Sequence, residues 1–223
     1  MLRALRDMMV TDLWRYSRRS DLNAFLRALR SFPGFRYTVT LRAATWATAL
    51  APGPVCRILR GVAWRLHSSV GRRAGWELPI GVRVGPGLFI SPHPGGLVVH
   101  PMAELGANCT LGHGVTIGET NRGARRGVPK IGDNVYIAAG AKVIGRVIVG
   151  SHAIVGANCV VTRDVAENGV VVGLPGKVIS SSGSAAYVHN IDWPEPASYS
   201  AWQRIEARCS ALVLSAEETH PSG

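Results

Sequence analysis

The chain has 223 residues, 47% of them hydrophobic and 17% charged, with a formal net charge of +11. This length predicts one domain, or one domain with an appendage, and the composition excludes a disordered chain. The four cysteines lack CxxC spacing, so we expect neither a metal site nor a disulfide framework. We find no signal-peptide pattern, and the longest uncharged stretch near the N-terminus, 43–56, is too short to span a bilayer. We therefore expect a cytoplasmic protein.

The first of three predicted regions, 1–78, is helical and holds most of the positive charge. It contains fourteen arginines against four acidic residues, a net +10, whereas 79–223 carries +1. Apolar residues at helical spacing predict a helix that begins near Ser20-Asp21 and ends before Pro33-Gly34, with further helices over about 37–50 and 54–70. We interpret the arginines as solvated helix faces. Binding of a polyanionic partner or surface is the alternative.

From about Val84 a repeat of six residues replaces the helical pattern. An aliphatic residue, mostly followed by glycine, opens each frame, and a small or β-branched residue stands four positions later. The aliphatic positions are Leu105, Leu111, Ile117, Ile131, Ile137, Val143, Val149, Val155 and Val161. A period of six predicts a β-solenoid over 79–179, in which three short strands make one triangular coil. Cys109 and Cys159 occupy the small-residue position, so we expect them inside the coil.

Two segments interrupt the repeat, and a third follows it. The first, 91–96, reads SPHPGG. The second, 119–130, holds Arg122, Arg125, Arg126 and Lys130 among glycines, and we expect a projecting basic loop. After the repeat, 180–223 forms a weakly patterned tail with a short helix expected over 201–214 and no assigned function.

The segments GPGLFISPHPGGLVV, GVTIGET and VPKIGDNVYIAAGAKVIG resemble those of the hexapeptide-repeat acyltransferases. The stretch 77–179 looks like the serine O-acetyltransferase branch of that family. The resemblance implies a left-handed parallel β-helix that follows an α-helical region, in a mainly β protein that assembles as a homotrimer or a dimer of trimers. It also implies acetyl-CoA as a cosubstrate, bound in the groove between neighbouring coils, with no permanently bound cofactor.

The same resemblance assigns the catalytic residues. His93 matches the catalytic histidine, and Glu77 matches the carboxylate that pairs with it, which is aspartate in the family. A histidine has the right pKa to remove a hydroxyl proton at neutral pH, and a carboxylate on the far ring nitrogen would fix its tautomer. Backbone N–H groups of Gly95-Gly96 are candidates to stabilise the oxyanion.

We expect the phosphates of CoA to meet the cations in and near the insert. These candidates are Arg122, Arg125, Arg126, Lys130 and Lys142. By resemblance, Thr120 and Ala139 fall where the family contacts CoA, the latter through its backbone.

The substrate-binding candidates Ser91, His113 and Val128 include two departures from the family. Val128 stands where the family has a histidine, and Ser91 with Pro92 stands where an acidic residue precedes the catalytic histidine. Both departures remove groups that would hold the charges of serine. Of the other histidines, we expect a structural role for His100. We expect solvated side chains at the remaining four, His67, His152, His189 and His220.

The leading hypothesis is an acetyl-CoA-dependent O-acetyltransferase that acts on L-serine and forms O-acetylserine for cysteine biosynthesis. An O-acetyltransferase for a saccharide or specialised metabolite is the alternative enzyme. A basic β-helix scaffold that binds a polyanionic surface is the non-enzymatic alternative. Because no nucleic-acid module is recognised, we expect no nucleic-acid partner, and we expect no membrane association.

Overall fold

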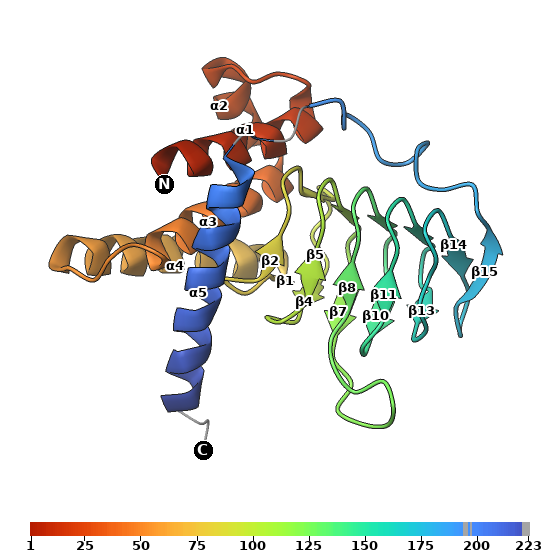
Figure 1. Cartoon of the computed structure of the whole chain (residues 1–223). Helices are drawn as coiled ribbons and strands as arrows, with labels where there is room; N and C mark the ends of the chain where they lie inside the picture. The colour runs from red at the N-terminus through yellow and green to blue at the C-terminus, as the bar shows by residue number, and fades with distance from the viewer. Residues whose placement is uncertain (194–195, 197, 220–223) are drawn as a thin grey trace.

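The structure, a computed structural model, describes residues 1–193, 196 and 198–219, with the backbone alone for 214–219. Four helices open the chain: α1 (Leu2–Ser17), α2 (Leu22–Ser31), α3 (Pro33–Thr48) and α4 (Pro54–Ala74), as Figure 1 shows. Asp21 caps α2, because its side chain accepts a hydrogen bond from the Ala24 N–H at 3.0 Å. Pro33 occupies the first turn of α3, where its missing N–H costs nothing, so this helix begins four residues earlier than predicted.

Fifteen short strands follow in the described residues. They are β1 (Trp76–Glu77), β2 (Arg83–Val84), β3 (Phe89–Ile90), β4 (Leu97–Val99), β5 (Glu104–Leu105), β6 (Thr110–Leu111), β7 (Val115–Gly118), β8 (Lys130–Ile131), β9 (Tyr136–Ile137), β10 (Lys142–Ile144), β11 (Ile148–Val149), β12 (Ile154–Val155), β13 (Val160–Val161), β14 (Val170–Val172) and β15 (Lys177–Ser180). They form a five-stranded sheet (β1-β4-β7-β10-β13), a four-stranded sheet (β11-β8-β5-β2) and a six-stranded sheet (β15-β14-β12-β9-β6-β3).

The register of these sheets explains the six-residue period. Each strand pairs with one from the next coil, so the aliphatic positions stack in columns such as Ile90, Leu111, Ile137, Val155 and Val171. All nine aliphatic frame positions are buried, as are Cys109 and Cys159. The prediction of a triangular coil of short parallel strands is therefore confirmed.

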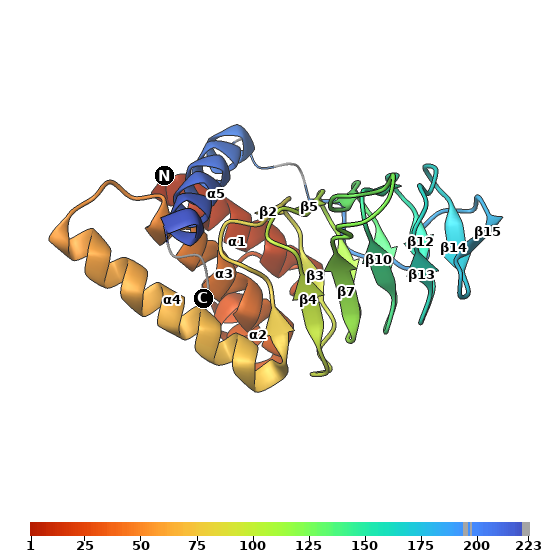
Figure 2. The same ribbon diagram turned by 90° about the horizontal axis from the view of Figure 1, so that it is seen from below.

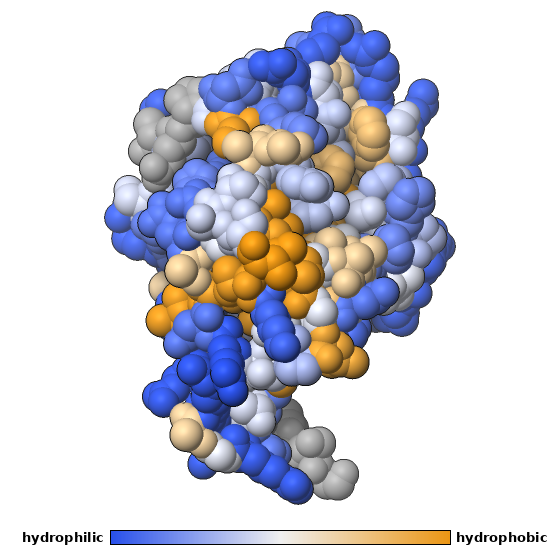
Figure 3. Space-filling model, turned by 90° about the vertical axis from the view of Figure 1, so that its right-hand side faces the viewer, coloured by the Kyte–Doolittle hydropathy of each residue, from blue (hydrophilic) through white to orange (hydrophobic). Residues whose placement is uncertain are grey.

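The last strand breaks the parallel order. β15 runs antiparallel to β14 and closes the far end of the six-stranded sheet. Leu174, Val178 and Ile179 are exposed there, and Figure 3 shows hydrophobic residues gathered on this end of the molecule.

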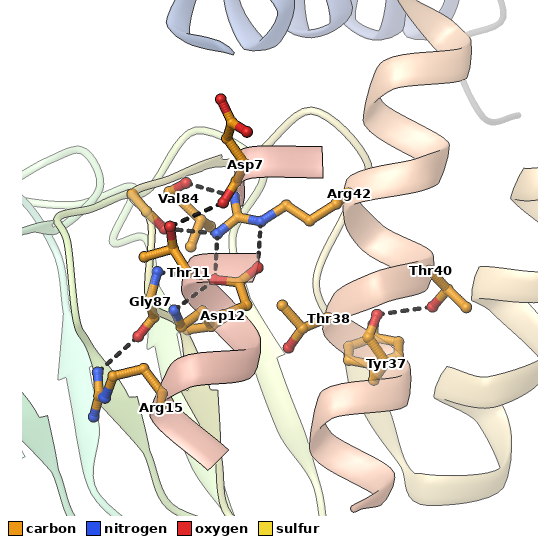
Figure 4. A network of polar contacts seen from close by, with 12 residues as sticks. Asp7, Thr11, Asp12, Arg15, Tyr37, Thr38, Thr40, Arg42, Val84 and Gly87 are labelled. Carbon is orange, nitrogen blue, oxygen red and sulfur yellow. Dashed lines mark hydrogen bonds and ion pairs between the residues drawn. The ribbon is translucent and has the colours of Figure 1, made fainter. Parts of the chain in front are cut away.

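A buried ion pair joins the helices to the first coil. Arg42 on α3 bonds both carboxylate oxygens of Asp12 on α1, at 2.9 and 3.2 Å, and donates to the carbonyls of Val84 and Gly85 at 2.7 Å (Figure 4). Asp12 also accepts hydrogen bonds from the N–H groups of Gly87 and Leu88. The interpretation of all the arginines as solvated is therefore wrong for Arg42, which is 1% exposed.

His67 on α4 also differs from its prediction. It is buried, its Nε2 lies 2.9 Å from the Leu78 carbonyl, and its ring stacks on Tyr37 with centroids 4.5 Å apart. Burial lowers the pKa of this imidazole, so the neutral form is favoured. In the sequence, His67 is a lone histidine among apolar residues, so its contacts with Leu78 and Tyr37 could not be predicted. Of the other histidines expected in solvent, His189 is exposed and His152 half-buried, whereas His220 lies outside the described residues.

After β15 the chain turns back and runs along the coil to the N-terminal helices (Figure 1). The segment 181–193, here called the strap, runs from β15 back to α1, as Figure 1 shows. Asp192 ties its end to α1 by accepting hydrogen bonds from Trp14 and Arg18. The helix α5 (Tyr199–Thr219) then packs against α1, α3 and β2, with Trp202 fully buried. This helix is longer than the one expected over 201–214.

Candidate active site

Three turns stack where the six-stranded sheet meets the five-stranded sheet, and we call them the histidine corner (91–96, 112–114 and 138–141). Backbone bonds hold them in line: Gly114 N–H donates to Gly96 O at 2.5 Å, and Gly140 N–H to His113 O at 2.8 Å. Gly140 has a φ of +74°, and a Cβ there would lie 1.9 Å from the Asn158 amide oxygen, so only glycine fits. The corner is thus fixed by backbone contacts.

The histidine corner brings two of the predicted residues face to edge. The rings of His93 and His113 have centroids 5.9 Å apart at an interplanar angle of 82°, and both side chains are exposed. Gly95 N–H donates to Ala74 O at 3.2 Å, so this amide is already used within the chain. Of the two proposed oxyanion donors, Gly96 therefore remains the candidate.

A cavity of about 410 Å³ opens beside these histidines. Its wall brings together four predicted residues, Ser91, His93, His113 and Ala139. The remaining lining residues, which sequence reasoning missed, are Arg15, Phe89, Thr110, Leu111, Gly112, Tyr136, Tyr187, His189 and Asn190. Three of these come from the strap, whose weak pattern carried no signal of a site.

Arg15 builds one side of the cavity and is a second exception to the solvated arginines. Its guanidinium donates to His189 O at 2.8 Å, Gly87 O at 2.7 Å and Thr110 Oγ1 at 2.9 Å. Burial lowers the pKa of Arg15 to about 10, so it stays charged at neutral pH. Because each of its three nitrogens donates one of these hydrogen bonds, Arg15 positions the strap against the coil.

Glu77 and Lys142 lie on the outer face of the five-stranded sheet that adjoins the histidine corner. The register places Glu77, Val98, Thr116 and Lys142 in one row across neighbouring strands. Lys142 Nζ donates to Gly114 O at 2.6 Å and Thr116 Oγ1 at 3.0 Å, so it lies close to the corner. Glu77 is exposed, and the hydrogen bonds of the described residues do not include one between Glu77 and His93.

The insert projects from the opposite edge of the same sheet, as predicted (Figure 1). Thr120 and Gly127 exchange backbone hydrogen bonds at its base, at 3.1 and 2.9 Å. Arg125 forms an ion pair with Asp164 at 2.9 Å, while Arg122 and Arg126 are exposed. The pKa of Asp164 is lowered by a hydrogen bond from the Ile148 N–H and by Arg125. Val128 is half-buried on the returning arm of this loop.

One chain does not bring the insert to His93. The four residues of β7 separate the histidine corner from the base of the insert, about 13 Å at ~3.3 Å per residue. Lys130 lies on the four-stranded sheet and pairs with Glu104 at 3.3 Å, so it faces away from both. His100 accepts a hydrogen bond from the Met102 N–H and lies 3.7 Å from Glu119, which agrees with its expected structural role.

The triangular coil and its stacked corner define the class of protein, that of the hexapeptide-repeat transferases. A family model described as bacterial transferase hexapeptide (six repeats) matches residues 129–163. Serine acetyltransferase of Synechococcus elongatus is 33% identical over 189 residues, which is 85% of this chain and 71% of the relative. Serine acetyltransferase of Staphylococcus aureus is 41% identical over 123 residues, 55% of this chain and 57% of the relative.

Solved structures of serine acetyltransferases are also similar to this chain. Neisseria gonorrhoeae serine acetyltransferase in complex with serine superposes with a TM-score of 0.62 at 29% identity, covering 79% of this chain and 69% of that one. Brucella abortus serine acetyltransferase in complex with coenzyme A gives a TM-score of 0.62 at 29% identity, covering 81% and 68%. The chain belongs to the serine acetyltransferase family, as its motifs predicted.

Proposed function

We propose that this chain transfers the acetyl group of acetyl-CoA to the hydroxyl of L-serine, with His93 as the general base. The observation that carries the proposal is the exposed His93–His113 pair, which lines a cavity of about 410 Å³ in a chain of this family. The complexes of family members with coenzyme A and with serine support both substrates. The product, O-acetylserine, would serve cysteine biosynthesis.

In the proposed reaction, His93 takes the hydroxyl proton as the serine oxygen attacks the thioester carbonyl. The tetrahedral intermediate then collapses, the C–S bond breaks, and CoA leaves as a thiolate that recovers the proton from the imidazolium. Glu77 stabilises the imidazolium from the neighbouring strand once the site is occupied. Gly96 N–H is the proposed donor to the oxyanion.

The separation of His93 from the insert supports a site shared between copies of the chain. In a homotrimer, or a pair of trimers, the insert of one copy would reach the histidine corner of its neighbour. The exposed side chains of Arg122 and Arg126 would then meet the phosphates of CoA. Thr120 at the base, the Ala139 backbone and Lys142 are the further proposed CoA contacts.

A second acceptor class has one observation in its favour. The residues that line the cavity include no acidic side chain among those the structure describes, whereas the aromatic rings of Phe89, Tyr136 and Tyr187 are present. Serine carries an ammonium group that a carboxylate would hold. A sugar or other neutral polyol has no such need, and its apolar ring face fits aromatic side chains.

A thiol-release assay with acetyl-CoA distinguishes these functions. Serine, homoserine and a panel of sugars are offered separately to the purified chain. Saturable release with serine is the expected result. Saturable release with sugars alone would replace serine as the acceptor, and no release with any acceptor would favour the basic scaffold.

A further inference from the structure

The outer face of α4 is apolar and exposed, and it has no packing partner among the residues that the structure describes. Val55, Ile58, Leu59, Val62 and Leu66 recur at spacings of three and four residues and form one stripe, here called the α4 stripe. Each of these side chains is between 43% and 67% exposed. Figure 2 shows the Pro54 end of α4 reaching away from the other helices and from the coil.

The opposite face of the same helix packs against the rest of the protein. His67 and Gly71 are buried against α3 and the first strand, and Ala63 and Val70 pack against the apolar clusters. The α4 stripe is therefore a second apolar face on one helix, which stability of the chain does not require. An apolar face of this length on a protein surface marks an interaction site.

The charge around the α4 stripe has one sign. α4 holds five arginines and no acidic residue, and no acidic residue occurs between Asp21 and Glu77. Arg65 and Arg73 lie on the stripe side of the helix and are exposed. The salt bridges among the described residues include none that uses an arginine of α4.

These observations select the occupant. A second copy placed stripe against stripe would bring two arginine-only helices together with no carboxylate on either to compensate. A bilayer that contains anionic phospholipids satisfies both features, since the stripe enters the acyl boundary and the guanidinium groups meet phosphate headgroups. No helix in the described residues is long and apolar enough to cross a bilayer, so α4 would lie along its surface.

We propose that the α4 stripe, with Arg65 and Arg73, docks the protein on the surface of an anionic phospholipid bilayer. This departs from the expectation of no membrane association, because the sequence alone does not show which apolar face of a helix remains exposed after folding. The proposal is independent of the acetyl transfer proposed above, because α4 supplies no lining residue of the cavity.

Vesicle co-sedimentation tests the proposal with four forms of the full chain. They are the unaltered protein, Ile58→Ser with Val62→Ser in the stripe, Arg65→Gln with Arg73→Gln beside it, and Val178→Ser with Ile179→Ser as the control. The control pair is 58% and 65% exposed at the far end of the coil, similar to the 67% and 52% of the stripe pair. Vesicles contain phosphatidylcholine alone or mixed with phosphatidylglycerol.

We expect the unaltered and control proteins to sediment only with the mixed vesicles, and both α4 variants to bind at least tenfold more weakly. Binding of the unaltered protein should fall as salt rises. Equal sedimentation with both vesicle types, none with either, or equal loss in the control would overturn the proposal. Light scattering of all four forms tests whether a second copy of the chain covers the stripe instead. A smaller particle for the stripe variant alone would assign the stripe to contacts between copies and would also overturn the bilayer proposal.

Discussion

At the scale of single residues, the proposed chemistry depends on one imidazole held by its backbone. His93 makes its ring contact with His113, and both belong to turns fixed by hydrogen bonds between coils. The coil does not need the His93 side chain for packing, since it is exposed. Function and stability should therefore separate at this residue.

His93→Ala should lower kcat/KM for acetyl transfer by about 10²- to 10⁴-fold, because general-base catalysis contributes about that much. The thermal unfolding midpoint should stay within error of the unaltered protein. Thiol release and thermal unfolding, measured on the same preparation, check both statements. Near-normal turnover would remove His93 from the mechanism.

A second residue makes stability depend on pH. Burial raises the pKa of Glu206 on α5 from 4.5 to about 7, while Arg42, 3.6 Å away, lowers it in part. Between about pH 4.5 and pH 7 the unfolded chain loses this proton and the folded chain keeps it, so the free energy of unfolding should fall as pH rises. Glu206→Gln should remove that part of the slope. Urea unfolding of both proteins across this pH range measures the difference, and parallel curves would contradict the assignment.

At the scale of elements, the helix α5 buries one large aromatic side chain against the rest of the protein. Trp202 is 0% exposed. The Arg42 guanidinium carbon lies over the Trp202 ring, 5.5 Å from the ring centroid. Trp202→Ala should lower the free energy of unfolding by about 3–5 kcal/mol, because a large cavity remains. Trp64→Ala on α4, where the ring is 57% exposed, is the matched control and should stay within about 0.5 kcal/mol. Chemical denaturation of both variants tests this, and equal losses would contradict it.

The elements also show why prediction succeeded in some places only. The coil repeats one environment every six residues, so Ile117 or Val143 can be placed inside without knowing any partner. The strap has no such repetition, because its contacts, such as Tyr187 with Tyr136, are each used once. Arg15 and Arg42 were misplaced for the same reason: their acceptors lie 72 and 43 residues away along the chain.

At the scale of the whole molecule, the distance between the histidine corner and the insert has a direct test. Mixing His93→Ala with a second variant, Arg122→Gln with Arg126→Gln, under conditions that exchange subunits should restore part of the activity. Restoration follows if one copy supplies the histidine and another the insert. Each variant alone is the control, and the assay is thiol release. No gain on mixing, despite exchange shown by mass, would place the whole site within one chain.

The C-terminal segment packs against the N-terminal helices and the first coil, and this affects how the protein folds during synthesis. The first coil and the opening helices are completed by bonds from the far end, such as Val84 N–H to Glu206 across 122 residues and Trp14 to Asp192 across 178. During synthesis the coils can form one after another as they emerge, since each contacts only its neighbours. The N-terminal helices acquire these contacts only after the C-terminal segment has been synthesised. A nascent chain therefore keeps the surface around Arg42 open until the segment with Trp202 and Glu206 has emerged from the ribosome.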